Sequence, residues 1–158
     1  MRSSRLRITL APIVFSLAAC AIAPAPKSIA DSTAADPRLT VLTRLLNDAD
    51  MTQTLQGPGP YTLFAPTDEA FKALPPATLD ALAKDKTRLK AVLANHLVQQ
   101  DLGAAEIKNG SVKTVQGGQL ALYRAGPFVT VDDAVVVNPD VRATNGSIQI
   151  VDKVLLPR

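Results

Sequence analysis

The order of hydrophobic and polar positions divides the chain into a helical half and a half made of short strands. Leucines recur at three- and four-residue spacing from Leu39 to Leu46, which predicts a helix of about three turns after Pro37. Beyond Gly110, short apolar runs alternate with Gly, Pro and Asp turns, up to a final strand that contains Ile148 and Ile150. This second pattern predicts antiparallel strands. Helices followed by a group of strands favour an α+β domain.

Between the two halves, Tyr61–Ala65 predicts a short strand covered on both sides, because it carries apolar residues on both faces. We expect Asp50 to cap a short helical turn before this strand, and the Gly-Pro pairs at 57–60 to end that turn. After the strand, Thr67 should cap the next helix, with two acidic residues at the positive helix end. A metal site at these carboxylates is the alternative, but no His or Cys lies nearby in the sequence.

The only histidine, His96, falls on a helical stripe that faces the core. Asp85 is expected to cap a helix from Lys86 to about Leu97, and the apolar positions of that helix continue to His96 at a seven-residue spacing from Leu89. A hydrogen-bonded core histidine is the favoured interpretation. A general base or a metal ligand is the alternative, and either would need partners from a chain with no second histidine.

The N-terminus predicts export and attachment to lipid. Arginines precede an apolar run from Ile8 to Ala19, which is too short to span a bilayer. The run ends in Leu17-Ala18-Ala19-Cys20, which resembles the bacterial lipoprotein signal. Residues 1–19 are therefore predicted to be a signal peptide, and Cys20, the single cysteine, the acylated first residue. An ordinary signal that releases a soluble protein is the alternative.

Residues 20–36 are rich in Ala, Pro and Ser and show no helical or strand period, which predicts a tether. The folded domain is then expected at 37–158. Ala21 after the modified cysteine is similar to the outer-membrane sorting signal of cells with two membranes. We therefore expect a lipoprotein of the outer membrane, with a periplasmic or secreted protein as the alternative.

The charge of the chain excludes a nucleic-acid partner. The formal net charge is +3, but three of the 17 Lys and Arg lie in the leader, which leaves 14 against 14 Asp and Glu. The rest of the chain is neutral, and no later stretch combines clustered basic residues with aromatic residues.

Two stretches of the sequence resemble the signature boxes of the fasciclin domain, "YTLFAPTDEAFKALP" and "ATNGSIQIVDKVLLP". The stretch "VLANHLV" is similar to the histidine-containing box between them, and the resemblance extends over residues 36–157. It implies a compact α+β fold in which a small β-rich wedge is flanked by several short helices. The two boxes are then expected to supply neighbouring central strands.

The resemblance implies an adhesion or protein-interaction module at the cell envelope, without catalytic activity and without a cofactor. The expected partner is an unidentified protein or glycan at the cell surface or in the matrix. A small-ligand-binding or hydrolytic envelope protein is the alternative. A hydrolase would need a nucleophile beside a base, and neither Ser111, Ser147 nor Thr67 has a His at motif spacing. We therefore expect no enzyme and no metal site.

The resemblance also marks four partner-binding candidates. In animal fasciclin domains, a Tyr-His pair in the central box and an acidic motif before the second box are linked to integrin binding. The corresponding positions here are Asn95 with His96, and Asp140 with Arg142. Pro139 favours an exposed loop or edge around the second pair, between two apolar strands. In the alternative interpretation, Asp140 only turns the chain.

Overall fold

The computed structural model describes residues 27–103 and 105–157. Its helices are α1 (Ile29–Ala35), α2 (Thr40–Asp48), α3 (Thr52–Gln56), α4 (Asp68–Lys72), α5 (Pro76–Lys84) and α6 (Lys86–Asn95). Its strands are β1 (Tyr61–Pro66), β2 (Leu97–Val98), β3 (Gly110–Lys113), β4 (Gln119–Ala125), β5 (Phe128–Val131), β6 (Ala134–Ala143) and β7 (Gly146–Val151). The predicted α+β class is confirmed, with helices first and strands last.

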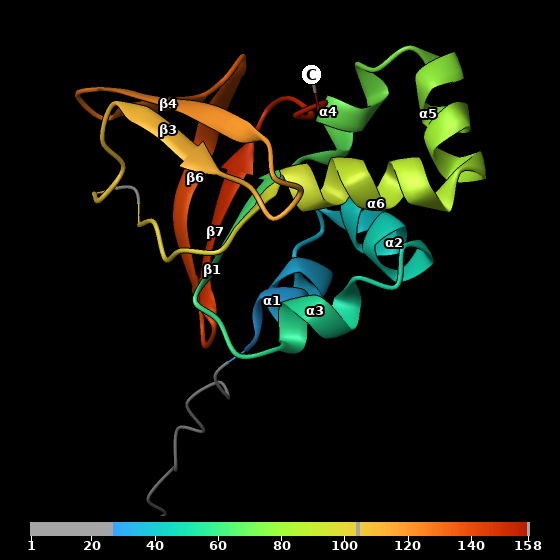
Figure 1. Cartoon of the computed structure of the whole chain (residues 1–158), viewed down its shortest axis with the longest axis horizontal. Helices are drawn as coiled ribbons and strands as arrows, with labels where there is room; N and C mark the ends of the chain where they lie inside the picture. The colour runs from blue at the N-terminus through green and yellow to red at the C-terminus, as the bar shows by residue number, and fades with distance from the viewer. Residues whose placement is uncertain (1–26, 104, 158) are drawn as a thin grey trace, which may run out of the picture.

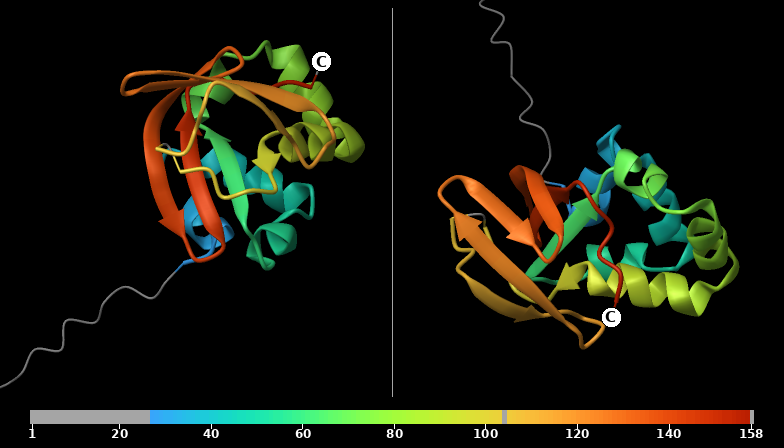
Figure 2. Two further views of the ribbon diagram at one scale, coloured as in Figure 1. Left: turned by 60° about the vertical axis from the view of Figure 1, so that its left-hand side comes forward. Right: turned by 90° about the horizontal axis from the view of Figure 1, so that it is seen from above.

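The seven strands form one sheet in the order β2-β1-β7-β6-β5-β4-β3. The two signature boxes supply β1 and β7, which are neighbours and pair in parallel, as expected, and which we call the central strands because they lie between the helices and the rest of the sheet. The other strand pairs are antiparallel. A bridge between Val98 and Thr114 joins the two ends of the order, so the sheet curls into a barrel-like wedge. The wedge lies beside the helices, which gather on one side of β1 and β7 (Figures 1 and 2).

The central strands separate two hydrophobic cores. Leu63 and Ile148 point toward the helices and join the larger core, which includes the leucines of α2 and α6. Phe64 and Val151 point the other way, into a smaller core inside the wedge with Leu120. A strand with apolar residues on both faces is therefore required at β1, as its sequence predicts.

The corner after β1 has the capping role expected of it. The Thr67 hydroxyl accepts the backbone N–H of Ala70 at 3.3 Å and so caps α4. Asp68 does more than the sequence predicts, because its carboxylate also accepts the backbone N–H of Val41 at 2.8 Å and the Thr40 hydroxyl. This carboxylate replaces the cap that α2 lacks at its own N-terminus, where Leu39 has no capping side chain.

Two expectations about the first half of the domain are wrong. The irregular tether was expected to extend to Asp36, but Ser28 and Asp31 form a capping box that starts helix α1. Ile29 of this helix is completely buried in the larger core. Asp50 was expected to cap α3, but the residue before α3 is Met51, which makes no capping bond. Asp50 instead adopts a positive φ of 56° in the turn between α2 and α3.

Candidate functional site

The four partner-binding candidates lie in two separate places. Asn95 and His96 lie at the C-terminal end of α6, and Asp140 and Arg142 lie in β6. Cys20, the predicted lipidation site, falls outside the described residues. The two places differ in burial and in the partners of their polar groups.

His96 lies in the interior, as the helical stripe predicts, and its ring is completely buried. Nδ1 lies 2.8 Å from the carbonyl oxygen of Val92, and Nε2 accepts the backbone N–H of Leu155 at 2.9 Å. The ring is therefore neutral, with its proton on Nδ1 donated to Val92. Burial lowers the pKa of His96 to about 4, and the hydrogen bond to the Val92 carbonyl opposes this shift.

Asn95 binds Leu155 as well, the residue of the C-terminal segment that His96 contacts, and we call this pair of contacts the clamp. Its side-chain amide donates to the carbonyl oxygen of Leu155 at 3.2 Å, and its own oxygen accepts the Thr114 hydroxyl at 3.4 Å. Asn95 is only 4% exposed. Asn95 and His96 thus hold the N–H and the C=O of one peptide residue, which fixes the C-terminal segment against α6. Both side chains face the protein interior and not solvent.

Asp140 lies on a bulge of β6, and Arg142 follows just beyond it, paired with Ser147; of the expected loop or edge, the structure has the edge. Strand β6 runs through them, but its pairing with β7 shifts between Val136 and Asn138 and again between Asn138 and Val141. Pro139 and Asp140 fall in the second shift, where Asp140 has a φ of 59°. The expected edge is present, because β5 pairs with β6 only at Ala134 and Val135. Asp140 and Arg142 are both exposed.

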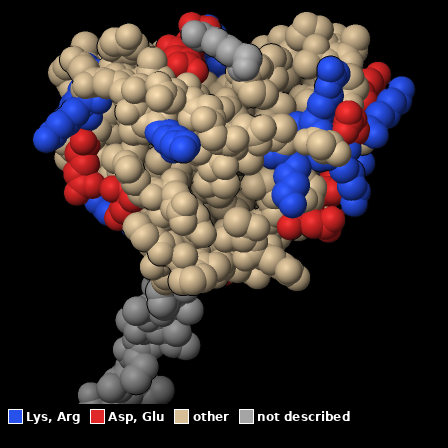
Figure 3. All heavy atoms as spheres, viewed as in Figure 1, with Lys and Arg blue, Asp and Glu red and all other residues tan. Residues whose placement is uncertain are grey.

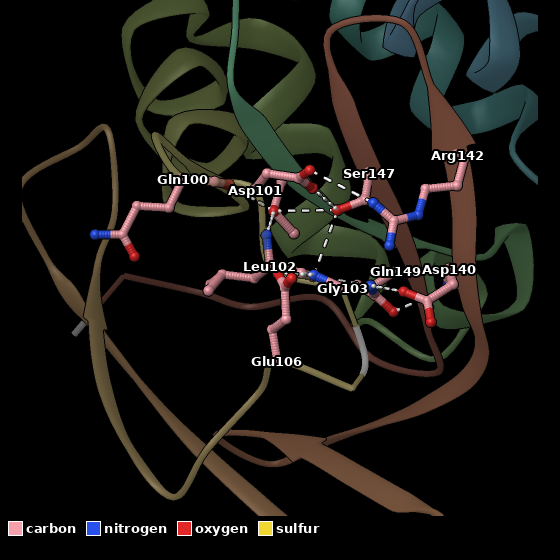
Figure 4. A network of polar contacts seen from close by, with 10 residues as sticks. Gln100, Asp101, Leu102, Gly103, Glu106, Asp140, Arg142, Ser147 and Gln149 are labelled. Atoms are coloured by element: carbon pink, nitrogen blue, oxygen red, sulfur yellow. Dashed lines mark hydrogen bonds and ion pairs between the residues drawn. The ribbon is translucent and has the colours of Figure 1, made fainter.

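A network of buried polar groups supports this bulge from behind (Figure 4). The Gln149 side chain accepts the backbone N–H of Asp140 at 3.2 Å and donates to the Asp140 carboxylate at 3.2 Å. The same amide nitrogen donates to the carbonyl oxygen of Leu102 at 3.1 Å. Gln149 itself is completely buried. The bulge is therefore tied to β7 and to the segment after β2.

Arg142 is held by the segment that follows β2. Its guanidinium lies 3.5 Å from the Asp101 carboxylate, and the Ser147 hydroxyl donates to the other oxygen of that carboxylate at 3.0 Å. A Cβ atom on Gly103 would lie 3.1 Å from the guanidinium and 3.4 Å from the Asp140 carboxylate. Glycine at this position lets both charged groups approach the backbone closely. The surface thus presents a carboxylate and a guanidinium side by side.

The residues behind the bulge were missed by the sequence analysis. Thr62, Ser147 and Gln149 are fully buried polar residues on the two central strands. The Thr62 hydroxyl donates to the carbonyl oxygen of Gln100 at 2.6 Å and accepts the N–H of Leu102 at 2.8 Å. The sequence did carry a signal for them, since Ser147 and Gln149 occupy alternate positions of an otherwise apolar strand and so share one face. Buried polar side chains need hydrogen-bond partners, which indicates that another segment of backbone packs on that face.

Two other polar residues that could carry a modification or bind a ligand make hydrogen bonds within the fold instead. Asn145, whose sequence matches a glycosylation acceptor, donates its amide to the carbonyl oxygens of Leu55 and Gly57 at 2.6 and 2.9 Å. Its side-chain oxygen accepts the N–H of Ile29 at 2.9 Å. Asp132 accepts the N–H of Ala121 at 2.9 Å in the turn between β5 and β6. Among the described residues, no group of three or more metal-binding side chains is found.

In the view of Figure 3, charged side chains gather at the two flanks of the molecule and the area between them carries little charge. No helix within residues 27–103 and 105–157 combines the length and the apolar character needed to cross a bilayer.

Comparison with known proteins identifies the family. The model of the fasciclin domain matches residues 37–157. The uncharacterized protein sll1735 of Synechocystis is 35% identical over 130 residues, which are 82% of this chain and 97% of that protein. The cell surface glycolipoprotein MPB83 of Mycobacterium bovis is 34% identical over 82% of this chain and 60% of its own length. Human periostin is 32% identical over 86% of this chain, which spans only 17% of periostin.

The fold agrees with a solved structure of a domain pair from the insect cell adhesion molecule Fasciclin I. The superposition has a TM-score of 0.69 at 17% identity and covers 83% of this chain and 51% of that one. The family match, the relatives and the shared fold agree with the two signature boxes in β1 and β7. This chain belongs to the fasciclin domain family.

Proposed function

We propose that this chain is an adhesion or protein-interaction module of the cell envelope that is held on a membrane by acylated Cys20 and acts without catalysis. The lipoprotein-like sequence before Cys20 supports the anchor. So does the relative named a cell surface glycolipoprotein. An outer-membrane position is favoured by Ala21 after the cysteine.

The observation that carries the binding role is the braced bulge of β6. It presents the Asp140 carboxylate and the Arg142 guanidinium on an exposed edge, while buried Gln149 fixes the backbone beneath them. Charged groups on a rigid support lose little conformational entropy when a partner binds. A partner of this surface would therefore be a protein or glycan with polar groups of both kinds.

A catalytic alternative finds no support in the arrangement of the described residues. The one imidazole is buried and its two nitrogens contact backbone groups. Ser147 and Thr62, the buried hydroxyls nearest the bulge, bond to Asp101 and to backbone carbonyls. A general base beside an exposed nucleophile is the arrangement that hydrolysis would require.

The binding role is tested by charge changes that keep the bulge. Asp140→Asn preserves the acceptor for Gln149 and tolerates the positive φ, and Arg142→Gln preserves a donor without the charge. Intact cells that display either variant should adhere or capture a partner less well than cells with the parent chain, at unchanged melting temperature. Arg88→Gln, a change of an exposed residue on α6, is the control. Equal binding by all variants would place the partner site elsewhere.

The anchor is tested separately, by replacing Cys20 with Ser. The variant should leave the membrane fraction and appear in the soluble fraction, because no acyl chain can then be attached. Unchanged fractionation would overturn the anchor but leave the binding role of the bulge intact. Retention in the inner membrane would contradict only the outer-membrane assignment.

A further inference from the structure

The wedge has an outer face that no described helix covers. Strands β3 to β6 turn one side toward the smaller core, with Leu122 and Val131 directly opposite each other and buried. The alternate residues point to the opposite side of these strands. The helices lie on the other side of the molecule (Figure 2). We call this side, built from alternate residues of β3, β4, β5 and the start of β6, the outer face.

The outer face carries the two most exposed aromatic side chains of the described chain. Phe64 and Phe71 are buried, whereas Tyr123 is 59% and Phe128 is 67% exposed. Tyr123 pairs with Thr130, and Ala125 pairs with Phe128. The two rings are therefore diagonal neighbours on the same side of one hairpin, with backbones about 7–8 Å apart. Because neither ring is buried, packing in a hydrophobic core does not explain why these positions are aromatic.

The surroundings of the two rings are small or polar and almost uncharged. Ala121 and Ala125 alternate with Tyr123 along β4, so no long side chain rises between the rings. Thr130 and Ser111 place hydroxyl groups on the same face, since they pair with Tyr123 and Ala121. The further outward positions are Gln119, Val135, Val137 and Lys113, of which only the last is charged.

The size and charge of the outer face decide what kind of partner fits it. About ten side chains form it, whereas a stable protein interface uses roughly 20–30 residues a side. A charged polymer would meet one cation on this face, Lys113, and a second, Arg124, at the turn of the hairpin. An uncharged sugar chain needs a small, flat surface on which aromatic rings stack against the C–H faces of the sugars, with hydroxyl and amide groups beside them to bind sugar hydroxyls.

We propose that Tyr123 and Phe128 form a stacking platform for an uncharged glycan. Each ring lies under one sugar unit, and the hydroxyls of Thr130 and Ser111 and the amide of Gln119 bind the sugar hydroxyls. The platform is independent of the bulge on β6 and of the lipid anchor, and it adds a glycan partner to the proposed function.

The test uses the full chain and a panel of neutral hexasaccharides with glucose, mannose, xylose or N-acetylglucosamine units, titrated to millimolar concentration by calorimetry. At least one should bind, and Tyr123→Ala and Phe128→Ala should each weaken that binding about tenfold or more. Lys90→Ala is the control, because Lys90 is an exposed residue of α6, on the helical side of the molecule. It should bind like the parent chain.

Three results would overturn the platform. The first is that no hexasaccharide binds. The second is that Lys90→Ala weakens binding as much as the aromatic changes do. The third is that only a carboxylated or sulfated derivative binds. If the two aromatic changes instead abolish self-association in sedimentation experiments, without any effect of sugar, the outer face is a protein interface and not a glycan site.

Discussion

The two candidate regions, the Asn95–His96 clamp and the Asp140–Arg142 bulge, derive from the same family resemblance but differ in the partners of their polar atoms. The clamp bonds mainly to backbone groups of its own chain and is buried. The bulge bonds to side chains and leaves its charges at the surface. Burial therefore separates a residue that the fold needs from one that a partner could reach.

Replacement of His96 by Ala should cost about 3–5 kcal/mol of the free energy of unfolding. The change removes a buried ring, leaves a cavity, and strands the N–H of Leu155 without an acceptor. Urea unfolding of the variant and the parent chain measures the difference. Lys90→Ala, an exposed change on the same helix, should be almost neutral. A small loss for His96→Ala would mean that the clamp is not structural.

The free energy of unfolding should fall as the pH is lowered from about 6.5 to 4. The pKa of His96 is 6.5 in the unfolded chain and about 4 in the fold. In that window only the unfolded state binds the proton, so acid favours unfolding, by roughly 3 kcal/mol in total. The stabilising effect of neutral His96 is fully present above pH 6.5.

The pH prediction has an internal control in His96→Gln, whose side chain can still accept the Leu155 N–H but does not titrate. Its stability should vary much less between pH 7.5 and 4.5. Asp36, whose pKa is lowered by a side-chain hydrogen bond from Arg38, responds mainly at lower pH and does not disturb this range. Equal pH dependence of both proteins would show that another group titrates.

Replacement of Gln149 by Leu should cost about 1–3 kcal/mol. The leucine fills a similar volume but removes the acceptor for the Asp140 N–H and the donor to Leu102. Because Gln149 lies behind the bulge, hydrogen exchange at Asp140 and Val141 should rise more than exchange in α6. Uniform exchange changes over the whole domain would mean that the bulge is not separately braced by this side chain.

Replacement of Arg142 by Gln should change the free energy of unfolding by less than about 0.5 kcal/mol. Its ion pair with Asp101 spans 3.5 Å between side chains that are 63% and 40% exposed, and exposed pairs of this kind contribute little. A denaturant melt measures the effect. A loss of several kcal/mol would assign Arg142 to the fold, as His96 is, and would remove the contrast between the two regions.

The sequence predicted the parts of the fold that depend on local spacing and caps. Thr67 and Asp85 cap helices as expected, because a cap is decided within three residues. His96 was placed in the core from the spacing of its own helix. Helix α1 was missed although Ser28 and Asp31 form a capping box, because its burial depends mainly on Ile29, and a single apolar residue gives no period.

The candidate site was predictable only in its residues and not in its geometry. Pro139 indicated an edge, which is present, but the two register shifts in β6 depend on how β7 pairs beside it. Gln149 braces Asp140 from nine positions away in sequence. Asp101 reaches Arg142 from 41 positions away. Such contacts follow from the arrangement of strands in space, which no local pattern records.

The parallel pairing of β1 with β7 has a consequence for the order in which the domain can fold. Every residue of β1 has a partner in β7, whereas β2 pairs only with Thr62 and Leu63. Thr62 and Ser147 are 85 positions apart, so closing the central pair joins a very long loop. Contacts between residues that are this far apart in the sequence slow folding. The centre of the sheet cannot form until the last strand has been made, and a chain that lacks it would expose both cores.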